Sequence, residues 1–241
     1  MPHYLNFFAL GYDNNVTHKT EFKVSDALTN SVFAVGCYWA GTTFVRTTGG
    51  STAIEFNATT QSVEKAAIFQ RATLHGDEGS LLRVIGAQGT KISNMAAEWQ
   101  FVEGDFTGGL GLEMCGSGTL VMTNRAFSST GPLRVSSGTM DFAANASWQN
   151  GTEVAVVGTG VLRIGANRTL GRKAVLRFAD DGKLVIPSGV TQRIRACTVD
   201  GEDMPVGTFT YETAPAALKP HLAPNGGALT ICGGGAMLIV R

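Results

Sequence analysis

The sequence contains little charge and no excess of either sign. Asp, Glu, Lys and Arg supply 16% of its 241 residues, 19 basic and 19 acidic, whereas soluble domains average roughly 25% charged residues. Nucleic-acid-binding proteins usually show a basic excess or a clustered basic stripe. The sequence shows neither, so we expect no nucleic-acid partner. A neutral, charge-poor surface opposes association only weakly, so this composition is compatible with self-association.

Cysteine and histidine are few, and neither is spaced as a metal site. No CxxC pair and no HExxH motif occurs, so we expect no metal and no cofactor. The wide separation of the cysteines favours free, largely buried thiols, and two disulfides in any of three pairings remain open. The residues concerned are Cys37, Cys115, Cys197 and Cys232, and His3, His18, His75 and His221.

Long apolar runs are also absent. No stretch of 18 apolar residues occurs, so we expect no membrane-spanning helix. The opening residues, MPHYLNFFALGYDNN, contain no basic region, and Asn6 interrupts their apolar run, which is not typical of a signal peptide. If the natural protein is exported, we expect this chain to be a mature or excised part of it.

Glycine, in contrast, is abundant, with 31 residues, or about 13% of the chain, against roughly 7% on average. Four of these glycines open the pattern Gly-x-Φ-x-Φ, in which Φ is apolar. The pattern recurs at nearly constant steps, at Gly118-Leu120-Met122, Gly138-Met140-Phe142, Gly160-Leu162-Ile164 and Gly182-Leu184-Ile186. Trp99 and Phe101 stand one such step earlier, and we expect them to continue the column.

Two further apolar columns keep the same period. One column consists of Leu112/Met114, Leu133/Val135, Val154/Val156 and Leu176/Phe178. The other consists of Phe127, Trp148 and Leu170. Alternation with period two is typical of a strand with one buried face, and a period of roughly 20 to 50 residues indicates a repeat array. We therefore predict an all-β fold, a parallel β-solenoid with about 21 residues per coil.

The solenoid prediction makes residues of successive coils spatial neighbours, roughly 4.8 Å apart. Glycine would form the corners, because it adopts positive φ freely. On the outer surface Glu113 would lie beside Arg134, and Asp141 beside Arg163, so that opposite charges alternate between coils. One interior ladder would consist of Leu120, Met140, Leu162 and Leu184.

The regular period covers residues 97–190. Residues 1–96 contain alternating apolar stretches at irregular spacing, which we interpret as further coils or a capping β region, with a separate N-terminal β-sandwich as the alternative. For residues 191–241 we expect a C-terminal cap, because a solenoid needs its terminal edges covered. The cap would contain a hairpin around DGEDMP, a helical turn in TAPAALKPHLAP and a final strand at Gly235-Met237-Ile239.

The stretch 109–140, GLGLEMCGSGTLVMTNRAFSSTGPLRVSSGTM, resembles the autotransporter-associated β-strand repeat. The matching residues are Gly116, Gly118, Thr119, Leu120, Asn124, Thr130, Gly131, Val135, Gly138 and Thr139, and Met140 replaces the usual closing Leu. The resemblance covers this stretch well and more of the chain loosely, without the N-terminal part. It implies a right-handed parallel β-helix in a secreted bacterial protein, at the cell surface or extracellular. It carries over no catalytic residue.

Paired carboxylates and exposed aromatics are the remaining candidates for chemistry. A glycosidase needs two carboxylates roughly 5–9.5 Å apart, and the candidate sets are Asp77/Glu78, Asp180/Asp181 and Asp200/Glu202/Asp203. Asp-Gly sequences are ordinary turn chemistry, so we expect turns there and assign no catalytic residue. Trp99 and Trp148 fall in inward columns, which leaves Trp39, beside Tyr38, as the candidate for surface recognition.

These observations favour a non-enzymatic, extracellular β-solenoid that acts as a scaffold, adhesion or self-assembly module. Its partners would be further copies of the chain, an extracellular glycan or a host surface. The alternative is a carbohydrate-binding or carbohydrate-active β-helix, similar to a polysaccharide lyase or glycosidase, with its groove in the irregular N-terminal region.

Overall fold

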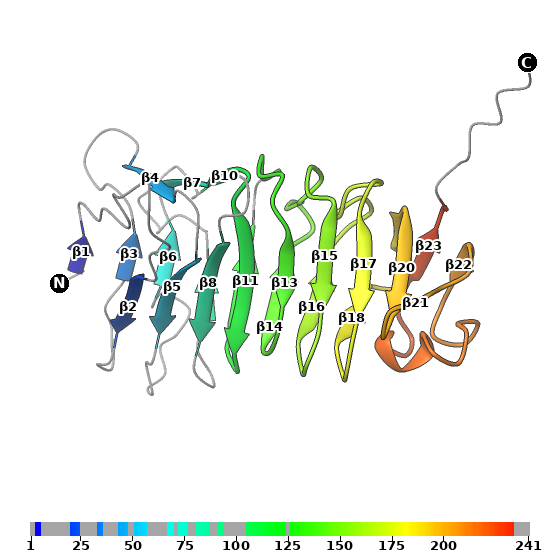
Figure 1. The fold of residues 1–241 in the computed structure, drawn as a ribbon. Helices are drawn as coiled ribbons and strands as arrows, with labels where there is room; N and C mark the ends of the chain where they lie inside the picture. The colour runs from blue at the N-terminus through cyan, green and yellow to red at the C-terminus, as the bar shows by residue number, and fades with distance from the viewer. Residues whose placement is uncertain are drawn as a thin grey trace, which may run out of the picture.

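The computed structural model describes residues 105–123 and 126–233 and, before them, the backbone of nine short strands between residues 3 and 93. The strands form an elongated stack of coils, with the first strand at one end and the last at the other (Figure 1). The described residues contain no α-helix.

Two long sheets form two sides of the stack. The first sheet consists, in spatial order, of β2 (Thr20–Val24), β5 (Ser51–Phe56), β8 (Leu81–Gly86), β11 (Gly111–Gly116), β13 (Leu133–Val135), β15 (Glu153–Val156), β17 (Val175–Phe178), β20 (Ala196–Val199) and β21 (Glu202–Asp203). The second sheet consists of β1 (His3–Leu5), β3 (Phe33–Val35), β6 (Ala67–Phe69), β9 (Lys91–Ser93), β12 (Thr119–Met122), β14 (Thr139–Phe142), β16 (Val161–Ile164) and β18 (Lys183–Val185). Neighbouring strands are parallel except β20 and β21. The predicted all-β solenoid is therefore confirmed.

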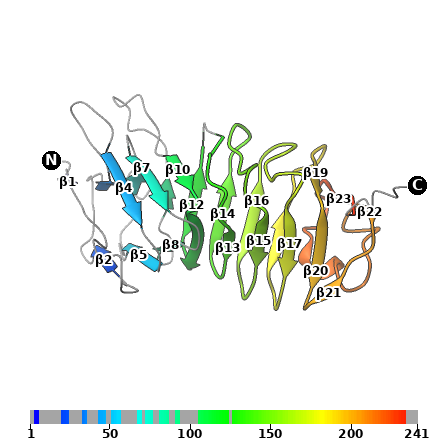
Figure 2. The same cartoon turned by 45° about the horizontal axis from the view of Figure 1, so that its top comes forward.

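A third side closes each coil between the two sheets. Toward one end it contains the parallel strands β4 (Thr43–Thr47), β7 (Ala72–Gly76) and β10 (Asp105–Gly108). Toward the other end it contains β19 (Thr191–Ile194), β23 (Ala228–Ile231) and β22 (Gly207–Phe209) (Figure 2). Between these two groups the coils meet through single bridges, of which one joins Trp148 to Leu170. We call this surface the third side.

The register of the central coils agrees with the predicted period. Leu133 lies opposite Val154, and Met140 lies opposite Leu162, as their columns predicted. Earlier coils are longer, since Met114 lies opposite Val84 of the preceding coil. The strands before residue 97 thus pair within the same three sides as the later strands, and the loss of a constant period reflects coils of changing length.

One predicted member of the second-sheet column is wrong. The strand next to β12 on its N-terminal side is β9, where Ile92 lies opposite Leu120. Trp99 and Phe101 were expected at this place from the constant period. Both residues lie outside the described part of the chain.

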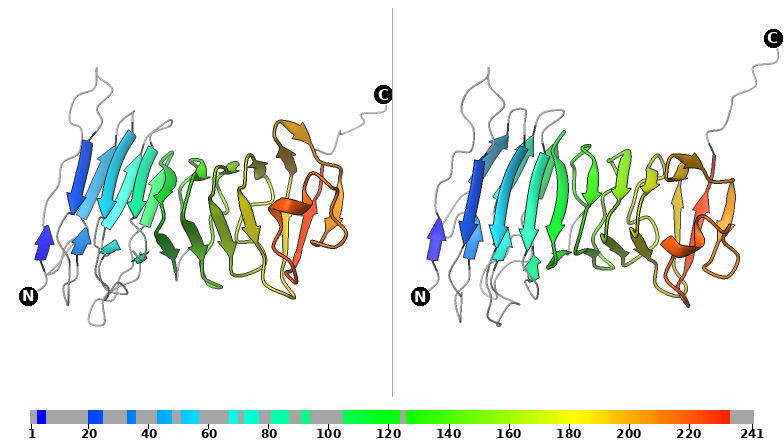
Figure 3. Two further views of the ribbon diagram at one scale, coloured as in Figure 1. Left: turned by 90° about the horizontal axis from the view of Figure 1, so that it is seen from below. Right: turned by 60° about the horizontal axis from the view of Figure 1, so that its bottom comes forward.

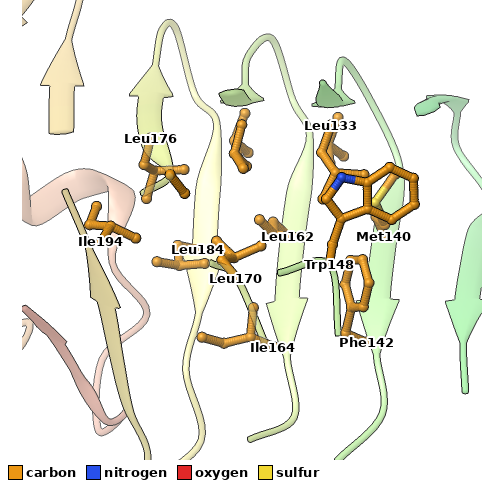
Figure 4. Packing of buried hydrophobic residues seen from close by; sticks show 14 of the residues in the cluster. Leu133, Met140, Phe142, Trp148, Leu162, Ile164, Leu170, Leu176, Leu184 and Ile194 are labelled. Carbon is orange, nitrogen blue, oxygen red and sulfur yellow. The ribbon is translucent and has the colours of Figure 1, made fainter. Parts of the chain in front are cut away.

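The interior is filled by ladders of apolar side chains from all three sides. Leu120, Met140 and Leu162 are completely buried, and Figure 4 shows the side chains of Met140 and Leu162 between the strands. Burying a leucine or methionine side chain contributes about 1.5–3 kcal/mol, so the ladders dominate the stability of the stack. On the third side the ring centroids of Phe127 and Trp148 lie 5.9 Å apart. The inward positions predicted for the Leu120 column and for the Phe127 column are therefore confirmed.

Glycine forms the corners because the preceding coil leaves no room for a side chain. A Cβ atom on Gly160 would lie 2.3 Å from the carbonyl oxygen of Val135, and one on Gly182 would lie 2.1 Å from that of Val156. Contacts this short with backbone atoms exclude any larger residue. Of the four glycines that open the pattern, only Gly138 has a positive φ, 68°, so the predicted reason holds for that corner and close approach of successive backbones explains Gly160 and Gly182.

The C-terminal segment covers all three sides at its end of the stack (Figure 3). On the first sheet β21 folds back on β20, and on the third side β23 pairs with β19. On the second sheet Leu222 bridges to Leu184, and the Gly227 N–H donates to the Ile186 carbonyl at 2.8 Å. These contacts satisfy backbone groups that an open sheet edge would leave unpaired.

The cap differs in detail from its prediction. The hairpin forms between β20 and β21, but the strand that follows, β22, pairs with β23 instead of extending the hairpin. The helical turn predicted between the prolines is the 3-10 helix η2 (Lys219–His221). The final strand predicted at Gly235-Met237-Ile239 lies outside the described residues.

Candidate interaction surface

The acidic pair Asp180/Asp181 forms a corner between β17 and β18. Asp180 has a φ of 56°, and the Gly182 N–H donates to the Ala179 carbonyl at 3.2 Å to close the turn. The Asp180 carboxylate also accepts a hydrogen bond from the Gly158 N–H at 3.2 Å, on the preceding coil. The predicted turn role is confirmed, and this carboxylate links two coils.

The second acidic set shapes the hairpin of the cap. Asp200 and Gly201 have φ values of 50° and 87°, the positive pair that a two-residue hairpin turn with the favoured twist requires. Glu202 and Asp203 follow in β21 with exposed side chains. The predicted turn at Asp200-Gly201 is therefore confirmed.

The other acidic and aromatic candidates stay predictions. Asp77, Glu78, Tyr38 and Trp39 lie outside the described residues, as does Cys37.

His221 and two of the described cysteines are buried and contribute to packing. His221 is buried, stacks on Phe178 with ring centroids 4.9 Å apart, and lies with Nδ1 2.7 Å from the Gly182 carbonyl oxygen. Because a carbonyl only accepts, Nδ1 donates in this bond. Cys197 is free and buried, and burial raises the pKa of its thiol to about 12. Cys115 is likewise buried, whereas Cys232 is free and exposed, so the prediction of buried thiols is wrong for Cys232.

Neither a metal centre nor a membrane span emerges from the described ranges. They contain no group of three or more His, Cys, Asp or Glu side chains placed to hold a metal ion. They also contain no helix with the length and hydropathy needed to cross a bilayer.

The first sheet carries the predicted charge ladder. Glu113 lies opposite Arg134, and the Arg134 Nε lies 3.2 Å from Glu113 Oε1. Ser136 Oγ donates to the same carboxylate oxygen. Glu113 is only 5% exposed, so its charge is held by neighbouring strands instead of by water. A similar cross-coil pair joins Arg177 Nη2 to Glu153 Oε1 at 3.6 Å.

The third side carries a cluster of cations that sequence reasoning missed. We define the basic face as the exposed residues Arg168, Arg172, Lys173, Arg193 and Arg195. The third-side segments 126–132, 143–152, 165–174 and 187–195 contain no aspartate or glutamate at all. Apart from Asp105 in β10, several coils away, the acidic residues of the described chain lie on the two sheets, at their corners or in the cap. A net charge of zero therefore conceals a strong lateral separation.

Backbone contacts hold the basic face together across two coils. Asn167 Oδ1 accepts the Thr191 N–H at 2.7 Å, beside Arg168 on one coil. At the other end the Arg195 N–H donates to the Ala174 carbonyl at 2.9 Å, next to Lys173. The two coils therefore run side by side from one end of the face to the other.

Gln192 fixes the middle of the basic face. Its side chain is completely buried, accepts the Leu170 N–H at 3.1 Å and donates to the Leu170 carbonyl at 3.0 Å. Because strand side chains alternate, an inward Gln192 and an inward Ile194 turn Arg193 and Arg195 outward. The expectation of no clustered basic surface is thus wrong, since the cluster is assembled only by the stacking of coils.

Comparisons of the chain with protein-family models, with curated proteins and with solved structures give no match. The likeness to the autotransporter-associated repeat therefore stays a prediction, and function has to be inferred from the fold and its surface.

Proposed function

We propose that the chain is a non-enzymatic β-solenoid scaffold of a secreted bacterial surface protein, which presents its sides to extracellular partners. The observation that carries this proposal is the use of carboxylates in the described part of the chain. Asp180 and Asp200 shape turns, whereas Glu113 and Glu153 pair with arginines of the next coil. The carboxylates of Asp180, Glu113 and Glu153 are bonded within the fold itself, which favours a supporting role over bond cleavage.

The cap favours contact with partners through the sides of the stack over contact through its C-terminal end. Strands β21 and β23 and the segment around Leu222 already cover the last coil on all three sides. End-to-end stacking there would have to displace these hydrogen bonds. The self-assembly role is therefore the less supported form of the proposal.

The proposal is tested by incubating the full chain with neutral and acidic polysaccharides and measuring polymer size by light scattering. We expect no shortening of any polymer. Shortening that disappears in an Asp77→Asn/Glu78→Gln variant, and persists in an Asp180→Asn/Asp181→Asn variant, would replace the scaffold by the carbohydrate-active alternative. Sedimentation velocity over a wide concentration range tests self-assembly, for which we expect a single monomeric species.

A further inference from the structure

We propose that the basic face binds a linear acidic polysaccharide, whose carboxylate or sulfate groups pair with the cations of two successive coils. The inference rests on the scaffold function, because it names the partner that the third side of the scaffold would hold.

The charges of the basic face have no counterpart within the described chain. The two ion pairs of the described residues, Glu113–Arg134 and Glu153–Arg177, both lie on the first sheet. The nearest strands of the cap, β22 and β23, contain no acidic residue. Five like charges in one area repel one another, so an external polyanion gains from each of them.

The arrangement of the cations fits a polymer better than a small anion. Arg193 and Arg195 are separated by two residues of extended chain, which corresponds to about 6–7 Å, and the neighbouring coil lies about 4.8 Å away. The guanidinium group forms two parallel hydrogen bonds to a carboxylate or sulfate, which suits the acidic groups of a polysaccharide.

A strip of hydroxyl groups continues beyond these arginines. Thr230 lies opposite Arg193 on β23, and its hydroxyl lies 2.9 Å from that of Thr208 on β22. Hydroxyl groups donate to and accept from the ring hydroxyls of a sugar. The polar strip therefore extends along the stack for more than one sugar unit.

The surroundings of the basic face disfavour other polyanions. Proteins that bind single-stranded nucleic acid combine a basic groove with exposed aromatic platforms. On the third side Phe106, Phe127 and Trp148 all point inward and are buried. A membrane-surface segment needs an apolar face as well as cations, and Val206 is the one large apolar side chain exposed in the described ranges.

The test compares two triple variants of the full chain that remove the same charge from different sides. The first variant is Arg172→Gln/Arg193→Gln/Arg195→Gln, on the basic face. The matched control is Arg163→Gln/Arg177→Gln/Lys183→Gln, whose parent residues are exposed on the two sheets. Circular dichroism and thermal unfolding establish that both variants are folded before binding is measured.

Affinities are measured for dextran sulfate, polygalacturonate and neutral dextran, as well as for single-stranded oligothymidine and phosphatidylserine vesicles. We expect both acidic polysaccharides to bind and dextran not to bind. Because each exposed ion pair contributes modestly, the first variant should bind about tenfold more weakly than the parent, and its affinity should depend less on salt concentration. The control variant should bind with the affinity of the parent. Binding of dextran sulfate alone would support the face and identify sulfate as the preferred group.

Equal weakening in both variants would overturn the assignment, because it would show binding by overall charge instead of by the basic face. Tighter binding of oligothymidine or of vesicles would overturn the choice of polysaccharide, and so would a failure to bind both dextran sulfate and polygalacturonate. Shortening of a bound polymer would refute the non-enzymatic scaffold. If the first variant still bound more weakly than the control in that case, the assignment of binding to the basic face would stand.

Discussion

The central coils and the C-terminal cap solve the same packing problem with different side chains. In the coils the ladders are apolar and backbone groups of the two sheets pair with the next coil in register, while the buried hydroxyls of Ser129 and Thr169 bond to backbone on the third side. In the cap no regular coil follows, and the buried polar side chains of Gln192 and His221 bond to Leu170 and Gly182 of the coils below. At this end of the stack, side chains of the cap thus make hydrogen bonds that the backbone of a further regular coil would otherwise make.

Removing a large side chain from the ladder of the central coils should destabilise the protein most. Trp148 is completely buried, and its indole N–H donates to the Gly131 carbonyl at 3.1 Å. Trp148→Ala should lower the free energy of unfolding by about 3–5 kcal/mol, measured by urea denaturation. The exposed neighbour Gln149 provides the control, since Gln149→Ala should change stability by no more than about 0.5 kcal/mol. Similar losses in both variants would contradict the packing described here.

Replacing a corner glycine should destabilise a central coil more than the start of the cap. Gly182→Ala places a Cβ against the Val156 carbonyl of a central coil and should cost about 3 kcal/mol, the upper range for overpacking. Gly189, which leads into the cap, has a φ of 80° and nothing within 4 Å of the place where a Cβ would lie, so Gly189→Ala should cost only about 1 kcal/mol of backbone strain. Thermal and urea unfolding of both variants measure the difference, and a reversed order would be inconsistent with close coil contact.

Gln192 tests how the cap replaces a strand. Gln192→Leu preserves an apolar fill of the ladder but leaves the N–H and C=O of Leu170 without their partners, which should cost about 2 kcal/mol in urea unfolding. The same substitution at exposed Gln149, on the same side of the stack, should be close to neutral. Stabilisation by Gln192→Leu would show that apolar filling outweighs the two hydrogen bonds.

The smallest effect concerns the thiol at the boundary of the cap. The pKa of Cys197 is raised to about 12 from an ordinary value of 9.0 because the thiol is buried. Because the thiol has a higher pKa in the folded than in the unfolded chain, its contribution to stability is fully present below about pH 9. This contribution is lost as the pH rises toward 12. At pH about 10 the loss should be on the order of 1 kcal/mol in the parent and absent in Cys197→Ala, as measured by urea unfolding. Cys232→Ala, at an exposed site, should keep the parent's pH dependence.

The sequence predicted the central coils because a parallel stack places equivalent side chains in register. Leu120, Met140 and Leu162 had to be apolar at a nearly fixed step, so their spacing carried the fold. The N-terminal coils were not predicted in register, because the step from Ile92 to its partner Leu120 is longer than those that follow, and the period disappears.

The basic face was not predictable for a related reason. Arg168 and Arg193 are far apart in the sequence, and the acidic residues that balance them lie on other sides. A composition of equal charges therefore gave the wrong expectation about clustering. Cys232 shows the same limit, since its exposure depends on where the cap ends the stack.

Near-constant coil length has an evolutionary consequence. Duplication of one complete coil would lengthen the molecule by a single strand spacing, about 4.8 Å, while every surviving neighbour keeps its partner. Reach can thus be adjusted in discrete steps by recombination alone, with no new core to be invented. The same operation would repeat whatever outward residues the copied unit carries, so that the number of ligand contacts grows together with length.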